Sequence, residues 1–260
     1  MSAPTFKMTL RLRLPMAASA VFGLVAVLLA VGALFPAVGH SIGKLSIPKG
    51  VAQLLGGADY GTITGWYQSE MGSIYGPLLI AGLAIVGASA SIAGEEEDRI
   101  LSLILAHPVT RSRLILAKAA AIAAIVVTVA VASWGGLIAG VALAGGGISL
   151  GHLAAYSLQL AFFGLAAGAV ALAIGAGTGR RSLANGAAAA VAILGWLING
   201  FAPLLSAISW LKYLSLFHYY EGNDPLTHGV DITNITVLGV ITLLLTALAV
   251  VTIDRRDLRA

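Results

Sequence analysis

The residues whose side chains are best suited to catalysis or binding lie in one charged segment, Gly94 to Arg113, which reads GEEEDRILSLILAHPVTRSR. Three consecutive glutamates, Glu95 to Glu97, begin it, and a short apolar run, His107-Pro108 and two arginines follow. Carboxylates and a histidine could bind a metal or transfer protons, whereas a charged segment between apolar stretches could bind a partner protein. The surrounding sequence decides between these chemistries.

Metal-dependent proteolysis fits the sequence poorly. The run Glu95 to Arg99 is similar to the glutamate motif EExxxR of one membrane metalloprotease family, but the arginine comes one residue too early and Ile100 takes its place. No two histidines lie inside the apolar stretches where they could bind zinc together with the glutamates; the five are His40, His107, His152, His218 and His228.

A second stretch, GHSIGKLS from Gly39 to Ser46, partly matches a phosphate-binding loop. The Walker A motif requires glycine where Val38 stands, and serine or threonine where Leu45 stands. Because both positions fail, the sequence predicts no nucleotide site in this chain.

The composition is that of a membrane protein. Hydrophobic residues make up 58% of the 260 residues and charged residues 10%, and the mean hydropathy is +0.95; soluble domains contain about 25% charged residues. The formal charge of +4 does not indicate nucleic-acid binding, because the basic residues lie at the ends of apolar runs. The absence of cysteine excludes disulfides and thiolate metal sites.

Six apolar stretches are long enough to cross a bilayer, which requires about 20 residues. They are Leu14 to Val38, Ile74 to Ala93, Leu114 to Ala144, His152 to Thr178, Leu183 to Ile208, and Ile232 to Ile253. The first is too long for a signal peptide and is interpreted as an uncleaved span. We therefore expect an all-α, polytopic membrane protein that forms one transmembrane domain over residues 1–260.

The basic residues predict the orientation. An even number of spans places both termini on one side. Twelve of the fifteen basic residues lie on that side: Lys7, Arg11, Arg13, Arg99, Arg111, Arg113, Lys118, Arg180, Arg181, Arg255, Arg256 and Arg259. Only Lys44, Lys49 and Lys212 lie on the other. The positive-inside rule then makes both termini and residues 94–113 cytoplasmic.

Two flanking segments have amphipathic character. Residues 1–15 mix basic and apolar side chains and end at Pro15, which predicts a short interfacial helix or, alternatively, a basic leader that only sets the topology. Residues 209–231 contain SWLKYLSLFHYY, which predicts an external interfacial helix. That helix would act as an aromatic anchor or as a lid over an outward exit.

Polar residues in two spans fall on shared helix faces. Asn185, Trp196 and Asn199 lie on one face of span five, and Tyr156 and Gln159 lie on one face of span four. Amides are costly against lipid, so these faces should meet protein or a hydrated path. Helix-to-helix hydrogen bonding and a substrate path both fit this pattern.

No Asp, Glu, Lys or Arg falls well inside any predicted span. Ion-driven carriers usually need such a residue as a relay, so energy for transport should come from another subunit. The charged segment is the candidate contact. Its acidic residues would form the first turn of a helix, and this helix would end near Leu105 because His107 precedes proline. Leu101, Ile104 and Leu105 would form its apolar face, which must be covered by lipid headgroups or by a partner protein.

This region resembles the coupling-helix region of type 2 ABC transporter permeases. The resemblance rests on the acidic cluster, the apolar helix, the run Ala106 to Arg111 and Lys118 entering span three, and span number and orientation extend it over the whole chain. It implies that the following residues contact an ATPase subunit: Glu95, Glu96, Glu97, Arg99, Leu101, Ile104, Leu105, His107, Pro108 and Arg111. The acidic turn would pair with basic residues of that subunit, or with Arg11 or Arg13.

The resemblance further implies a transporter subunit that is not itself an enzyme. Two permease chains, identical or paralogous, would assemble with two ATP-binding subunits that hold ATP and magnesium, so this chain would need no cofactor. Its place would be the inner membrane of a prokaryotic cell, and its activity the export of drug-like, antibiotic or lipid-like amphipathic molecules. An ion-coupled secondary transporter and an intramembrane metalloprotease remain the alternatives.

Overall fold

The computed structural model describes residues 3–39, 41, 59–105 and 110–256, and within these residues the fold is helical without a β-strand. Six segments are long and apolar enough to cross a membrane, so the predicted six-span, all-α architecture is confirmed. These spans are Pro4–Gly39, Ile63–Glu97, Arg111–Leu143, Leu150–Thr178, Arg181–Leu204 and Ile232–Arg255.

The spans and their connections are built from α-, π- and 3₁₀-helical elements. The α-helices are α1 (Ala3–Leu34), α4 (Ile63–Tyr67), α5 (Gly76–Ser89), α6 (Glu95–Glu97), α7 (Ile100–Leu105), α8 (Arg111–Leu143), α9 (Leu150–Thr178), α10 (Arg181–Phe201), α11 (Leu216–Glu221), α12 (Pro225–His228) and α13 (Ile232–Arg255). The π-helical elements are η1 (Phe35–Gly39), η2 (Gln68–Tyr75) and η3 (Ala90–Gly94), and the 3₁₀ elements are η4 (Ala202–Leu204) and η5 (Ser206–Leu214).

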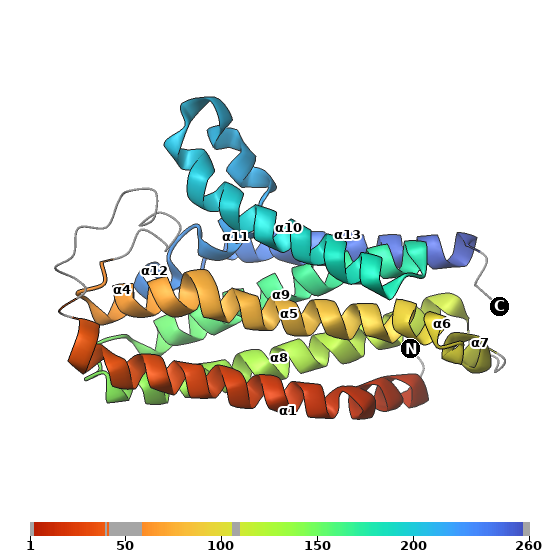
Figure 1. The fold of residues 1–260 in the computed structure, drawn as a ribbon, viewed down its shortest axis with the longest axis horizontal. Coiled ribbons are helices and arrows are strands. Elements are labelled where there is room, and N and C mark those ends of the chain that lie inside the picture. Colours follow the sequence, from red (N-terminus) through yellow and green to blue (C-terminus); the bar gives the residue numbers. More distant parts are fainter. Residues whose placement is uncertain (1–2, 40, 42–58, 106–109, 257–260) are drawn as a thin grey trace.

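α9 is the central helix, with α5, α8, α10 and α13 packed around it, while α1 packs along α8 (Figure 1). The start of α1, the end of α13 and the pair α6 and α7 lie together at one end of the bundle, called the terminal end below (Figure 1). The opposite end, which carries α4 and α12, is called the distal end. α10 leaves the bundle at an angle toward the distal end and carries η5 away from it (Figure 1).

Glycines at two helix crossings allow the close packing that the small-residue spacing predicts. A Cβ atom on Gly140 of α8 would lie 2.5 Å from the carbonyl oxygen of Leu28 in α1, and one on Gly168 of α9 would lie 3.1 Å from the Cβ of Ala84 in α5. Both α1 and α5 therefore approach their neighbours almost backbone to backbone, which increases dispersion contacts where lipid weakens the hydrophobic driving force.

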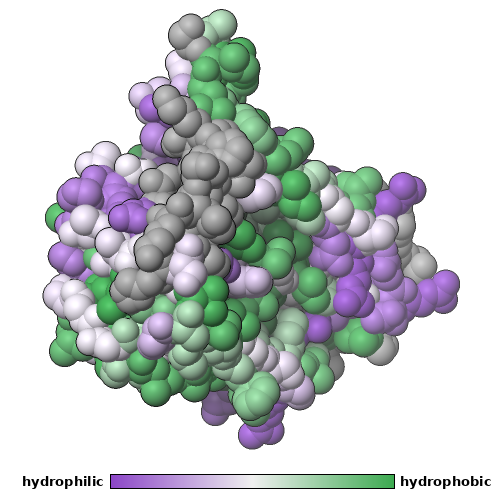
Figure 2. Space-filling view, turned by 60° about the vertical axis from the view of Figure 1, so that its left-hand side comes forward, coloured by the Kyte–Doolittle hydropathy of each residue, from purple (hydrophilic) through white to green (hydrophobic). Residues whose placement is uncertain are grey.

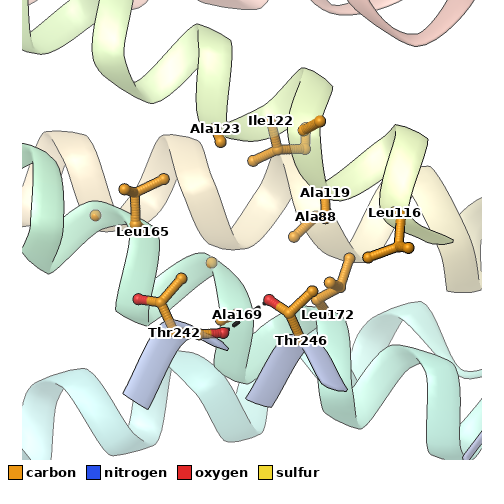
Figure 3. A pocket seen from close by; sticks show the side chains of 13 residues that line it. Ala88, Leu116, Ala119, Ile122, Ala123, Leu165, Ala169, Leu172, Thr242 and Thr246 are labelled. Carbon is orange, nitrogen blue, oxygen red and sulfur yellow. Dashed lines mark hydrogen bonds between the residues drawn. The ribbon is translucent and has the colours of Figure 1, made fainter. Parts of the chain in front are cut away.

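The outer surface suits a lipid environment. Figure 2 shows apolar side chains over much of the visible face, with hydrophilic ones gathered toward its two sides. A groove of about 410 Å³ between α5, α8, α9 and α13 is lined by Ala, Gly, Leu and Ile, and by Thr242 and Thr246 (Figure 3). Both threonine hydroxyls donate to carbonyls of α13 itself, so this groove offers no free polar contact.

The N-terminal segment differs from the prediction. α1 runs without a break from Ala3 to Leu34 and contains Pro15, so the first fifteen residues do not form a separate helix. Proline removes one backbone hydrogen bond, the one to the carbonyl of Arg11, but a spanning helix keeps its other bonds because lipid offers the backbone no alternative partners.

Span two is longer than predicted at both ends. It begins at Ile63 and therefore includes Glu70, so the absence of charge holds only for its middle part, residues 74–93. The helix also does not end at Gly94, which has helical backbone angles. It continues to Glu97 and breaks at Arg99, whose φ of 59° lies in the left-handed region.

Span five is shorter than predicted. α10 stops at Phe201, a 3₁₀ turn with Pro203 follows, and the predicted interfacial helix is divided into η5 and α11. Trp210 of η5 is exposed, as an aromatic anchor requires, whereas Phe217 and Tyr220 of α11 are buried in the core. The aromatic run thus serves two purposes, and its second half packs inward.

Replacing Gly140 by alanine should destabilise the fold, because the new methyl group must displace the backbone of α1. Overpacking of this kind costs about 1–3 kcal/mol. Gly135→Ala is the matched control: it lies in the same helix, with no atom within 4 Å of its added Cβ. The thermal unfolding midpoint of the detergent-purified protein should fall for Gly140→Ala and stay level or rise for Gly135→Ala. Equal midpoints would contradict the proposed close contact.

Candidate functional site

Three consecutive glutamates of α6, called the glutamate cluster below, each contact a different helix at the terminal end. Glu95 forms an ion pair with Lys118 of α8, and Lys118 also donates to the carbonyl of Ser91. Glu95 is 6% exposed and Lys118 is fully buried. A lysine withdrawn from water in this way needs such partners to remain charged.

Glu96 joins α6 to the end of α13. It forms an ion pair with Arg256, directly after α13, and is 3% exposed. The same guanidinium donates through Nε to the carbonyl of Ala176 in α9, 3.2 Å away. Gly179, at the C-terminus of α9 with a φ of +62°, lies so close to this pair that a Cβ atom there would meet both side chains.

Glu97 joins α6 to the start of α10. Its Oε1 atom accepts a hydrogen bond of 2.9 Å from the backbone N–H of Arg181, the first residue of α10. The N-cap residue Arg180 makes no side-chain cap, so Glu97 satisfies one of the free N–H groups at this end. The carboxylate also lies at the positive end of the helix dipole, which favours its charge.

Arg111, at the start of α8, makes a further contact with the end of α13. Its guanidinium donates to the carbonyls of Ile253, at 3.0 Å, and Arg256, at 2.7 Å. Ser112 donates to Asp254 at 2.7 Å. A cation at the C-terminus of a helix is favoured by the dipole, so this contact fixes α13 to α8.

The observed partners differ from those predicted for the acidic turn. Glu95 and Glu96 form ion pairs with Lys118 and Arg256, while Arg13, one of the predicted partners, interacts with Glu95 through its charge. The sequence indicated Lys118 and Arg256 as basic residues on the predicted cytoplasmic side, and Lys118 also as a residue entering span three, but it indicated no ion-pair partner for either. Nothing in the spacing could identify Arg256, because it lies 160 residues from Glu96.

The predicted apolar face of α7 is only partly on the surface. Leu101 is 1% exposed, so its side chain belongs to the interior of this chain and is not free to dock, which corrects the prediction. Ile104 is half-buried and Ile100 is 39% exposed. The side chain of Leu105, together with His107 and Pro108, lies outside the described residues, as does nearly all of the stretch 39–46.

The residues predicted for a substrate path separate into two places. Asn185 lies toward the terminal end, where it accepts a hydrogen bond of 2.5 Å from Ser89 of α5. The other four gather near α11. Tyr156 donates to the carbonyl of Met71 at 2.8 Å, and Gln159 donates to the carbonyl of Tyr219 at 3.4 Å. Helix-to-helix hydrogen bonding therefore accounts for part of both polar faces.

Trp196 lines a pocket of about 320 Å³ in the distal half, between η2, α5 and α10, called the distal pocket below. Its thirteen lining residues are Ser73, Ile74, Pro77, Leu78, Ala81, Gly82, Ile85, Phe163, Ala189, Ala192, Ile193, Trp196 and Phe217. Most are apolar or aromatic. Asn199, three residues after Trp196, points to a different group, the carboxylate of Glu221, to which it donates at 2.9 Å.

Glu221 was not predicted as a site residue, because it lies in the connection 209–231, where the prediction was based on the aromatic residues alone. Burial raises its pKa to about 7, against the effect of hydrogen bonds from Ser73 and Asn199 and with a smaller contribution from the negative charge of Asp224. Its Oε1 atom is buried without a hydrogen-bond partner in the described part of the chain. The only feature of the sequence that could have indicated this site is that Glu221 is the one acidic residue in the run LFHYYE.

A metal centre does not emerge from these groups. Within the described residues, no three His, Asp or Glu side chains are placed to hold a metal ion.

Removing one partner of the pair Glu95–Lys118 should destabilise the protein strongly, because a buried charge is left alone. The cost for Lys118→Met should be about 3–5 kcal/mol, and adding Glu95→Gln in the same chain should recover much of it. Asp98→Asn, an exposed acid in the next turn, is the control. Thermal midpoints of the single and double variants measure the coupling, and additive losses would show that the two charges act independently.

The comparisons with known proteins agree with this architecture. A family model described as ABC-2 family transporter protein matches residues 5–258. None of the curated proteins matches the chain. The family match covers all six spans, the glutamate cluster and the residues around Glu221. The chain therefore belongs to the ABC-2 family of membrane transporter proteins.

Proposed function

We propose that this chain is the permease subunit of an ATP-driven exporter and that a separate ATP-binding subunit contacts it at α6, α7 and the residues up to Arg111. ATP and magnesium would be held by that partner. Family membership supports this proposal, since ABC-2 permeases generally work with ATP-binding subunits.

The observation that carries the proposal is the arrangement of the glutamate cluster. Glu95 holds α8, Glu96 holds the end of α13, and Glu97 holds the start of α10. A force applied to α6 and α7 is therefore delivered to spans two, three, five and six together. Coupling between ATP hydrolysis and transport requires different contacts in the two conformations of the transporter. Because breaking a buried ion pair is costly, α6 and the helices joined to it should move as one unit.

The basic residues support the orientation in the membrane that this proposal requires. If the terminal end faces the cytoplasm, twelve of the fifteen basic residues lie on the cytoplasmic side, as the positive-inside rule expects. It also turns α7, with its exposed Ile100, toward the compartment that holds ATP. The chain would then act as a pair of permeases in the inner membrane of a prokaryotic cell.

The distal pocket is the proposed part of the substrate path. It lies between spans two and five, and it is lined mainly by apolar and aromatic side chains, which suits a drug-like or lipid-like amphipathic molecule. Tyr156, Gln159 and Asn199 do not line it, but they bond η2 and α11, two of the elements that form it. Asn185 would instead help to join α10 to α5.

An ion-coupled carrier is the second candidate, and Glu70 and Glu221 are the groups that would favour it. Both lie toward the distal end, whereas residues 74–93 of span two carry no charge. A proton or ion relay would need groups through the middle of the bundle. The energy source we propose is therefore the ATP-binding subunit.

Ile100→Asp should reduce binding of the ATP-binding subunit, because a charge would replace an exposed apolar contact on α7. Tagged protein purified from its native membrane should carry about tenfold less of that subunit, judged by mass spectrometry and by ATP hydrolysis. Ile208→Asp is matched in residue type and exposure, 38% against 39%, but lies in η5. Unchanged co-purification in Ile100→Asp, or equal loss in both variants, would reject this docking site.

A further inference from the structure

The distal pocket has an aromatic wall that extends to α11. Phe163, Trp196 and Phe217 line the pocket. The ring of Phe163 lies 4.7 Å from that of Phe217 and 5.0 Å from that of Tyr220, measured between centroids. Aromatic faces carry partial negative charge, and several rings around one space favour a cation over an anion.

A carboxylate borders the same pocket. Phe217 lines the pocket and lies one helical turn before Glu221 in α11, and Asn199, three residues after the pocket-lining Trp196, donates to the carboxylate of Glu221, so this carboxylate lies beside the pocket. Asn199 donates a hydrogen bond of 2.9 Å to the Oε2 atom of Glu221, while Oε1 is buried without a hydrogen-bond partner in the described residues. Nothing in the permease mechanism proposed above uses this acid.

Unpaired polar atoms gather around this place. Four buried side-chain atoms in α9, α10, α11 and the turn that follows lack a hydrogen bond within the described residues: Gln159 Oε1, Trp196 Nε1, Glu221 Oε1 and Asp224 Oδ1. Three of these four are oxygens. Buried polar atoms are normally paired, so such a concentration points to a bound polar or charged group.

The pocket is open toward the lipid side of the bundle. Leu78 of α5 and Ile193 of α10, which both line it, are 65% and 58% exposed. A molecule dissolved in the bilayer could therefore enter between these helices without crossing a polar barrier. A lipophilic molecule would also fit the apolar lining.

We propose that the distal pocket, with Glu221 at its border, binds a lipophilic organic cation. The rings of Phe163, Trp196 and Phe217 hold its apolar body, and Oε1 of Glu221 compensates its charge. A lipophilic anion meets repulsion from Glu221 and Asp224, and a neutral lipid leaves Oε1 unpaired. The inference deepens the proposed function, on which it rests, by naming the class of molecule carried.

The binding test uses the purified full chain in detergent and two probes of the same shape and opposite charge, tetraphenylphosphonium and tetraphenylborate. Equilibrium dialysis should show saturable binding of the cation only. Glu221→Gln should weaken cation binding about tenfold or more, because a buried charge contact is lost. Asp231→Asn is the control, since asparagine can still cap α13 as Asp231 does.

A second variant keeps the test sharp if Glu221→Gln folds poorly. Ala192→Phe fills the pocket from α10 and leaves Glu221 in place, so cation binding should be lost while the thermal midpoint stays near that of the original chain. Equal binding of the two probes, or cation binding that neither variant changes, would overturn the proposal.

Cation binding should also depend on pH. Protons compete with the cation for Glu221, whose pKa burial raises to about 7, so the affinity should rise about tenfold from pH 6 to pH 8. The elements packed against α11 contribute Tyr156 from α9, Lys212 from η5 and Asp231 before α13, and His218 and Asp224 lie near in sequence. Glu221→Gln should remove this pH dependence, and a slope that persists in the variant would assign it to another of these groups and count against the site.

The two proposals fail separately. Binding is measured on the permease alone, so loss of the ATP-binding subunit in the Ile100→Asp experiment has no bearing on it. Absence of cation binding, in turn, would remove the substrate class and leave the ATP-driven permease intact.

Discussion

Charges removed from water beside a lipid phase must find partners inside the protein, and this constraint shapes the terminal end of the molecule. Successive residues of an α-helix point about 100° apart, so three consecutive glutamates cover most of the circumference of α6. Each can then reach a different neighbour, and Lys118, Arg256 and the N-terminus of α10 are those neighbours. The resulting contacts join span two to spans three, five and six.

α10 connects the glutamate cluster with the proposed cargo site. Its first residue, Arg181, donates its N–H to Glu97 at the terminal end, and Asn199 near its other end donates to Glu221 beside the distal pocket. An unbroken helix transmits displacement along its axis, because its internal hydrogen bonds resist bending. Movement of the glutamate cluster would therefore change the contacts of the proposed cargo site, which links the energy source to the path without an ion relay.

Much of the fold could be predicted, but the sites were predicted unevenly. Long apolar runs of the right length specify spans, so all six were found, although the ends of span two and span five were misplaced. Polar residues on span faces were found as well, because amides such as Asn199 are rare in lipid. Leu101 was assigned to a docking surface on helical spacing, which indicates an apolar face but does not distinguish a partner protein from the chain's own core.

The sequence by itself determined the number of spans, the placement of both termini at one end of the bundle and the place of the charged segment, because hydrophobic length and charge distribution act along the chain. Only the tertiary structure decided which groups meet. The pair Glu96–Arg256 joins residues 160 positions apart, and the burial of Glu221 depends on α9 and α10 closing over α11. Such contacts are set by how helices pack in three dimensions, and no local pattern encodes them.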